Sequence, residues 1–316
     1  MLNYMKGIVA FAKKYMVPLL LLLCISAVAQ QDPQYTQYMY NTLVVNPGYT
    51  GSTGGIEANL LHRSQWIGIN GAPQTQSFSI HSPYSKLYDH IGIGLSVVND
   101  KIGPSNEVYT DANFSYTIVT GAEGKLSFGL KAGARVLNID WSKGRYYQEG
   151  DPLLNTNINN KIAPAVGAGI YYYTNNWYAG ISVPNFIRNN IYDDVQESVV
   201  SGRLHYYVIT GFVFNISNNL KFKPAVMGKI VNGAPVTLDA SANFLLQEIV
   251  TLGAAYRWND AVSALAGVQI TENIFIAYSY DYSVTELNKY NNGSHEFMIR
   301  FQMLPKSNRI KSPRFF

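Results

Sequence analysis

The chain has 316 residues, of which 47% are hydrophobic and only 14% are charged, and its formal net charge is +4. Three of its 24 lysines and arginines fall within the first 29 residues, so the remainder carries 21 basic against 20 acidic residues. With this near-neutral balance, the charge argues for neither nucleic acid nor an acidic surface as a partner. The only cysteine, Cys24, lies in the same N-terminal stretch, which leaves the rest of the chain without a thiol.

Residues 1–29 have the order of a secretory signal peptide. Lysines precede an apolar stretch at residues 16–25 that is too short to span a bilayer as a helix, and Ala27-Val28-Ala29 is a small-residue cleavage pattern. We therefore expect cleavage before Gln30 and export from the cytoplasm.

Residues 30–55 combine the turn-forming pairs Asp32-Pro33 and Asn46-Pro47 with many tyrosines and aliphatic residues. Such a segment is too apolar to remain a free tail in water, so we expect it to pack against another surface on the periplasmic side of the membrane. Two interpretations stay open. The one we favour is a plug that closes the following domain from below, and the other is docking onto periplasmic partner proteins.

From residue 56 to residue 304 the dominant periodicity is two. Apolar side chains alternate with polar or small ones over residues 126–136, and the pattern recurs at residues 236–246 and 295–303. Strict alternation over such a length predicts a strand with one apolar face. Strands of soluble sandwiches average about 5 residues, whereas strands of about nine or more residues cross a membrane when they are tilted.

A closed barrel is the only sheet that satisfies every backbone group in lipid, and its apolar side chains face outward. We therefore predict an all-β fold, a transmembrane antiparallel β-barrel of about 14 strands (roughly 12 to 16), over residues 56–304. A basic periplasmic tail, residues 305–316, follows it. The predicted strands begin near residues 56, 74, 90, 107, 124, 163, 176, 203, 219, 235, 249, 261, 273 and 294. Charges of both signs on the polar faces favour ion pairs inside the barrel.

Connection lengths give the expected orientation, because such barrels have short periplasmic turns and longer external loops. We predict tight turns after the fourth, sixth, eighth, tenth and twelfth strands. The long loops are expected at residues 101–106, 140–161, 185–202 and 285–292. Pro224 lies inside a predicted strand, where it cannot donate a ladder hydrogen bond, and a bulge would accommodate it.

Two of the long loops contain aromatic and arginine side chains of the kind that dominate protein interfaces. These candidate partner-binding residues are Trp141, Arg145, Tyr146 and Tyr147 in one loop and Phe186, Arg188 and Tyr192 in the other. An equally open interpretation is that both loops fold over the barrel mouth as a lid.

The pattern favours no enzyme, cofactor or metal. The five histidines are scattered, and the chain has no His-x-x-x-His spacing, no Gly-x-Ser-x-Gly elbow and no phosphate-binding loop. A hydrolase at the barrel rim, with His81 or His90 beside Asp89, is one alternative, although a turn-stabilising role for these residues is favoured. The other alternative is a general diffusion porin, in which lumen charges set the ion selectivity.

One set of residues, at the two ends of the strand domain, forms sequence motifs that can be compared with those of a known family. Its members are Asp32, Pro33, Gln34, Asn46, Pro47, Tyr49, Gly51, Arg63, Trp66, Pro313 and Arg314. With the residues between them, they resemble the PorP/SprF family of Bacteroidetes outer-membrane proteins over nearly the whole mature chain. The chain departs from many family members at Ser312, where they have cysteine.

The resemblance implies a non-enzymatic outer-membrane component of the type IX secretion system, in the Gram-negative cell envelope. It implies a role in delivering or anchoring a secreted adhesin, or other type IX cargo, through the C-terminal domain of that cargo. Periplasmic secretion-ring components are further implied partners, and in gliding bacteria the family is linked to motility. Outer-membrane lipid is the expected surrounding, with no nucleic acid bound.

Overall fold

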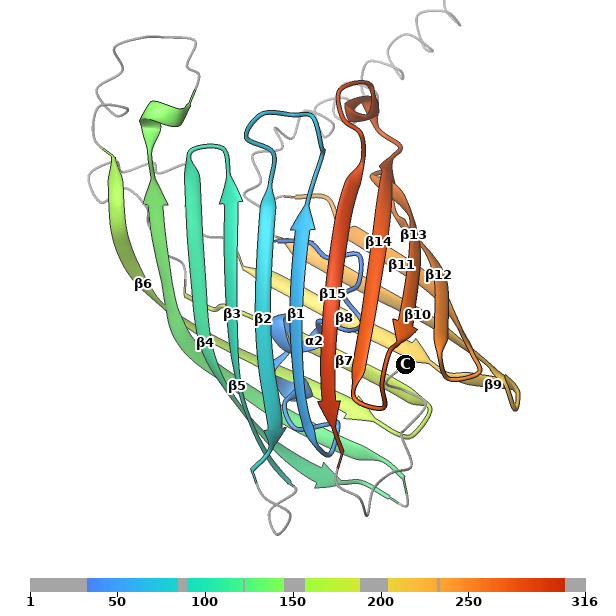
Figure 1. Cartoon of the computed structure of the whole chain (residues 1–316). Helices are drawn as coiled ribbons and strands as arrows, with labels where there is room; N and C mark the ends of the chain where they lie inside the picture. The colour runs from blue at the N-terminus through green and yellow to red at the C-terminus, as the bar shows by residue number, and fades with distance from the viewer. Residues whose placement is uncertain are drawn as a thin grey trace, which may run out of the picture.

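The computed structural model describes residues 33–84, 90–121, 123–144, 157–187, 204–231 and 234–304. Within these ranges nearly all regular structure is strand, and the strands form one antiparallel sheet that closes on itself (Figure 1). The expected signal peptide and the basic tail at residues 305–316 lie outside the described residues.

Each strand pairs with its neighbours in the sequence, in the up-and-down order typical of a barrel. The strands are β1 (Ile56–Ser64), β2 (Gln74–Pro83), β3 (Ile91–Ile102), β4 (Ser105–Val119), β5 (Lys125–Ile139), β6 (Ile158–Tyr173), β7 (Trp177–Val183), β8 (His205–Phe212), β9 (Phe214–Ser217), β10 (Leu220–Val231), β11 (Thr237–Leu246), β12 (Val250–Arg257), β13 (Ala261–Gln269), β14 (Ile274–Ser283) and β15 (Ser294–Met303). The barrel closes where β1 pairs with β15 over its full length.

The short helical elements among the described residues are α2 (Thr42–Val45) and three 3-10 turns. These turns are η1 (Pro47–Tyr49), η2 (Trp141–Lys143) and η4 (Glu286–Lys289). In this part of the chain, no helix is long and apolar enough to cross a membrane.

Strands β8 and β9 occupy one strand position of the barrel and are separated by Val213. The register with β10 is the same on both sides of the interruption, and the two positions of β10 left unpaired there are Lys223 and Pro224. Proline has no N–H to donate, so the ladder breaks there without the expected bulge. The register instead shifts between Leu220 and Lys221. When β8 and β9 are counted as one interrupted strand, the described residues form a barrel of 14 strands, as predicted.

Side chains alternate between the outer wall and the lumen. Leu130 is 60% exposed on the outer wall, whereas its neighbour Lys131 is 7% exposed and faces inward. The same alternation continues along the other strands, and it confirms the predicted apolar outer wall and polar lumen. Trp177, for example, lies on the outer wall, whereas the next residue, Tyr178, faces the lumen and is 3% exposed.

The connections distinguish the two ends of the barrel. We call the end with residues 65–73 and 284–293 the long-loop end, and the opposite one the short-turn end. The predicted tight turns are confirmed at the short-turn end. Between β11 and β12, Gln247 and Glu248 both adopt positive φ, which is the geometry of a type I′ hairpin.

One predicted long loop is wrong. Residues 101–106 form a tight hairpin, because β3 continues to Ile102, β4 starts at Ser105, and only two residues join them. The polar residues that suggested a loop belong to strands instead. Lys101, for example, is the register partner of Gln74 in β2 and of Asn106 in β4.

Candidate functional site: the N-terminal segment inside the barrel

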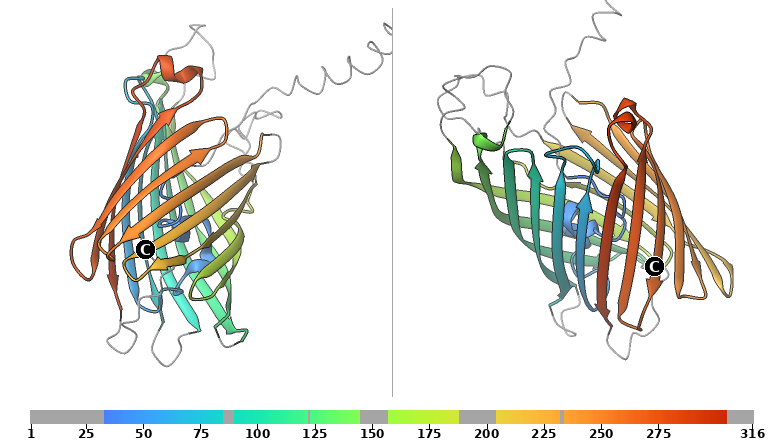
Figure 2. Two further views of the ribbon diagram at one scale, coloured as in Figure 1. Left: turned by 90° about the vertical axis from the view of Figure 1, so that its right-hand side faces the viewer. Right: turned by 45° about the horizontal axis from the view of Figure 1, so that its top comes forward.

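Residues 33–55, called the N-terminal segment below, lie inside the barrel, as the two views of Figure 2 show for α2. Tyr35, Tyr38 and Leu43 are each at most 3% exposed. They join the main hydrophobic cluster together with lumen-facing residues such as Tyr171 and Ile209. The segment contains no charged residue. The lumen therefore surrounds a neutral stretch of chain.

The segment runs along the barrel from one end to the other. Thr36 contacts Glu296 and Asp281, which lie two residues from the long-loop ends of β15 and β14. Gly51 contacts His81, which lies near the short-turn end of β2. The start of the segment is thus nearest the long-loop end, and the chain enters β1 at the short-turn end.

A buried charge cluster holds the start of the segment. Arg63 of β1 donates to Asp281 at 2.7 Å, to Glu296 at 3.2 Å and to the Thr36 hydroxyl at 2.9 Å. The backbone N–H groups of Thr36 and Gln37 donate to the two carboxylate oxygens of Glu296, at 3.0 and 2.8 Å. The side chains of the three charged residues are at most 3% exposed. Buried charges are stable only when paired and hydrogen-bonded, so this cluster fixes the position of the segment.

A second cluster holds the end of the segment through His81. Its Nδ1 accepts a 3.1 Å hydrogen bond from the N–H of Gly51. In the neutral ring the proton therefore lies on Nε2, which is 3.4 Å from Oε1 of Glu57. The Tyr49 hydroxyl donates to the same oxygen at 3.3 Å, and its ring meets the His81 ring edge-on. Gly51 has a φ of +72°, and a Cβ there would lie 2.8 Å from the Cα of Gly92.

Between these clusters, Asn46 and Gly48 lie directly on the barrel wall. Asn46 donates through Nδ2 to the carbonyl of Ile170 at 3.1 Å, and its Oδ1 accepts the N–H of Gly48 at 2.8 Å. A Cβ at Gly129 of β5 would lie 2.1 Å from the Gly48 nitrogen, and one at Gly169 of β6 would lie 2.1 Å from Oδ1 of Asn46. These strand glycines make room for the segment.

Tyr40 faces two cations of the wall from the middle of the segment. Lys223 lies 5.3 Å and Arg300 5.2 Å from the centre of its ring, which is the geometry of cation–π contacts. Burial raises the pKa of the Tyr40 hydroxyl to about 12, because the phenolate form would lose its hydration.

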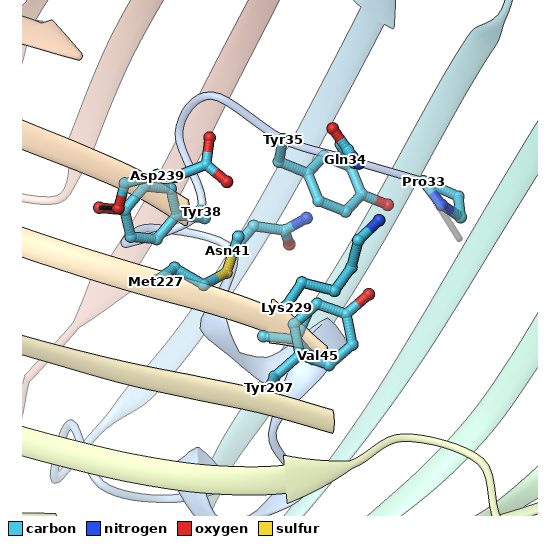
Figure 3. Close-up of a pocket in the computed structure, with 10 residues that line it drawn as sticks. All are labelled: Pro33, Gln34, Tyr35, Tyr38, Asn41, Val45, Tyr207, Met227, Lys229 and Asp239. Atoms are coloured by element: carbon cyan, nitrogen blue, oxygen red, sulfur yellow. Dashed lines mark hydrogen bonds between the residues drawn. The ribbon is translucent and has the colours of Figure 1, made fainter. Parts of the chain in front are cut away.

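Beside β8, β10 and β11 the segment leaves a small cavity (Figure 3). Its volume is about 10 Å³, roughly the space of one water molecule. It is lined by Pro33, Gln34, Tyr35, Tyr38, Asn41, Val45, Tyr207, Met227, Lys229 and Asp239. A cavity of this size is far smaller than small-molecule pockets of about 300 Å³ or more.

The structure gives roles to many of the predicted residues. The expected ion pairs of the lumen are present, for example Lys131 with Asp111 at 2.7 Å and Arg257 with Asp239 at 2.6 Å. Of the family-signature residues, Pro33, Gln34, Asn46, Pro47, Tyr49 and Gly51 belong to the N-terminal segment, Arg63 to β1 and Trp66 to the loop after it. Asp32, Pro313 and Arg314 lie outside the described residues.

Sequence reasoning missed Glu57 and His81 as anchors of the segment. Its alternative placed His81 beside Asp89 at the rim, but His81 is 2% exposed and bound to Gly51. Asp89 lies outside the described residues, and the ring of His90 lies beside that of Tyr116. The described residues contain no group of three metal-ligating side chains.

The candidate partner loops are described only in part. Trp141 starts η2 after β5, and its N–H donates to Oδ1 of Asn157 at 3.0 Å. Phe186 follows β7, is 47% exposed, and donates its N–H to the carbonyl of Val166. Both lie beyond strands that end at the long-loop end. The other candidates, Arg145, Tyr146, Tyr147, Arg188 and Tyr192, lie outside the described residues.

A closed antiparallel barrel of 14 strands, with an apolar outer wall and a polar lumen, defines an outer-membrane β-barrel protein. Residues 27–301 match the sequence profile of the family described as type IX secretion system membrane protein PorP/SprF. The chain therefore belongs to the PorP/SprF family, and its role is connected with secretion at the outer membrane.

Several solved outer-membrane proteins are similar to this chain at low sequence identity. Omp33 of Acinetobacter baumannii has 10% identity and a TM-score of 0.46, over 79% of this chain and 100% of its own. The toluene transporter TbuX of Ralstonia pickettii has 10% identity and a TM-score of 0.48, over 85% and 94%. A FadL homologue of Pseudomonas aeruginosa has 13% identity and a TM-score of 0.45, over 87% and 95%. No curated protein matches the sequence.

Proposed function

We propose that the protein is a non-enzymatic component of the type IX secretion system that helps deliver or anchor a secreted surface protein, such as an adhesin. Membership of the PorP/SprF family supports the secretion role. The observation that carries the proposal is the N-terminal segment, which occupies the lumen and bonds to the wall at both ends. A bore filled in this way leaves the barrel ends and loops as the functional surfaces.

In this proposal the N-terminal segment is a plug. A barrel of this strand number is too wide for wall side chains alone to fill, so a resting closed state needs an inserted element. The segment supplies one, because its tyrosines and aliphatic side chains are buried against the wall. The same filling argues against the rival function of a general diffusion porin.

The long-loop end is the external surface in this proposal, because outer-membrane barrels have longer loops outside. Trp141 and Phe186 mark the two loops that would contact a secreted partner through its C-terminal domain. Periplasmic secretion-ring components would meet the short-turn end, and through them the protein would be linked to gliding motility. The proposal also includes cleavage of the signal peptide, residues 1–29, before Gln30.

A pull-down tests the anchoring function. The tagged protein is extracted from its own outer membrane in mild detergent, and the proteins that come with it are identified by mass spectrometry. We expect a large secreted surface protein or type IX ring components. A loop variant, Trp141→Ala with Phe186→Ala, should recover less of the surface protein, whereas Trp177→Ala, on the outer wall at the short-turn end, is a matched control. Recovery of the barrel alone would contradict the proposal.

A further inference from the structure

The barrel wall contacts the N-terminal segment through its backbone as well as its side chains. Six hydrogen bonds join wall side chains to backbone groups of the segment. They involve Glu296 with the N–H of Thr36 and of Gln37, Arg257 with the carbonyl of Tyr35, Ser182 with that of Val45, Ser115 with that of Thr50, and His81 with the N–H of Gly51. Backbone hydrogen bonds do not depend on the sequence of the bound chain, as in other modes of peptide recognition.

The charges of this interface belong to the wall, and several of them pair with one another. Arg63 bonds to Asp281 and Glu296, and Arg257 bonds to Asp239, while the segment contributes no charge. Removal of the segment would leave these ion pairs with both partners. The charges of these ion pairs are thus satisfied by the barrel itself, and water can replace the neutral groups of the segment that contact them.

We propose that the lumen is a polypeptide-binding site for an uncharged, tyrosine-bearing stretch of chain. Residues 33–55 occupy it in the same molecule, and a separate peptide of the same chemistry can replace them. This inference rests on the proposed plug and adds to it a ligand class and exchange.

The side-chain contacts define what the site accepts. The amide of Gln37 is fully buried and donates toward Ser279 and the backbone carbonyl of Glu296. A carboxylate at this position could not donate to the Ser279 hydroxyl or to the Glu296 carbonyl, and it would be buried without hydration. Tyrosines fit because the Tyr38 hydroxyl hydrogen-bonds with Ser241 at 3.1 Å and the Tyr40 ring lies between cations. The site therefore selects against acidic side chains and for tyrosine.

The experiment uses the full chain with a protease recognition sequence inserted at Gly54, where no other atom lies within 4 Å of an added Cβ. The folded barrel is cut in detergent and incubated with an excess of a fluorescent synthetic peptide of residues 33–53. We expect the fluorescent peptide to bind saturably and the original segment to be released. Mass spectrometry detects the released segment. A Gln37→Glu peptide should bind at least roughly tenfold more weakly, because it buries an unpaired carboxylate that has lost both hydrogen bonds of the amide.

Two results would overturn the proposal. One is retention of the cut segment with no uptake of peptide, which would make the segment a permanent part of the barrel. The other is equal binding of the Gln37→Glu peptide, which would mean that the lumen does not select its ligand. A chain carrying the insertion but left uncut controls for nonspecific binding. If exchange failed while the pull-down still recovered type IX components, the secretion role would stand and only this inference would be lost.

Discussion

Arg63 and Glu296 face each other across the seam where the first and last strands close the barrel. Their Cα positions are register partners in the β1–β15 pairing, and their side chains form a buried ion pair at 3.2 Å. Thr36 bonds to both, through its hydroxyl and its N–H. The pair that joins the two ends of the sheet therefore also holds the N-terminal segment.

Replacing Arg63 by Met should destabilise the barrel strongly. The carboxylates of Asp281 and Glu296 would remain buried without their cation, and such losses cost about 3–5 kcal/mol. Denaturant unfolding in detergent, followed by tryptophan fluorescence, measures the change. Lys143→Ala is the control, because its ion pair with Asp140 is exposed and its loss should stay within about 0.5 kcal/mol. Equal effects of the two changes would show that the seam cluster is not a major source of stability.

Gly129→Ala should displace the N-terminal segment. The new Cβ would lie 2.1 Å from the backbone nitrogen of Gly48, which no side-chain rotation can relieve. A cysteine placed at Asn41, which is 2% exposed, should then react much faster with a maleimide. Gly228→Ala is the matched control, since an added Cβ there meets no atom within 4 Å. Unchanged labelling in the Gly129 variant would contradict the close seating of the segment.

Alkaline pH should weaken docking of the segment. Burial raises the pKa of Tyr40 from 10.0 to about 12, so the docked form keeps a proton that the undocked form loses. The stabilisation is complete below pH 10 and disappears as the pH rises through about 12. Tyrosinate absorbance, compared between the parent and Tyr40→Phe, measures this titration. A Tyr40 hydroxyl that titrates near pH 10 would mean that the segment is not buried.

Much of the barrel follows from its sequence because the alternation of lipid-facing and lumen-facing side chains is local. Trp177 and Tyr178 show what the alternation predicts. Adjacent residues of a strand face opposite sides, so only one of the two can lie on the outer wall. Once Trp177 is assigned to the outer wall, this alternation alone places Tyr178 in the lumen. The hairpin at residues 103–104 was missed because polar residues at the ends of two strands resemble those of a loop.

The site was less predictable because its partners are distant in sequence. Thr36 and Glu296 are separated by 260 positions, and nothing in the local pattern selects Glu296 over the other lumen carboxylates. Their contact depends on the closure of the whole barrel. The mixed charges of the polar faces did predict ion pairs within the lumen, and the apolar character of residues 33–55 indicated that they pack against a surface. The wall glycines that seat the segment could be identified only from the structure.

The most direct test of the closed barrel is its conductance in a planar bilayer. Three forms are compared: the full chain, a chain lacking residues 33–50, and a chain with a disulfide between cysteines at Asn41 and Ser77, whose side chains are 3.1 Å apart. We expect no steady conductance from the full chain or the cross-linked one, and an open channel from the truncated one. Steady conductance from the full chain that persists in the cross-linked form would contradict closure by the segment and would favour a porin.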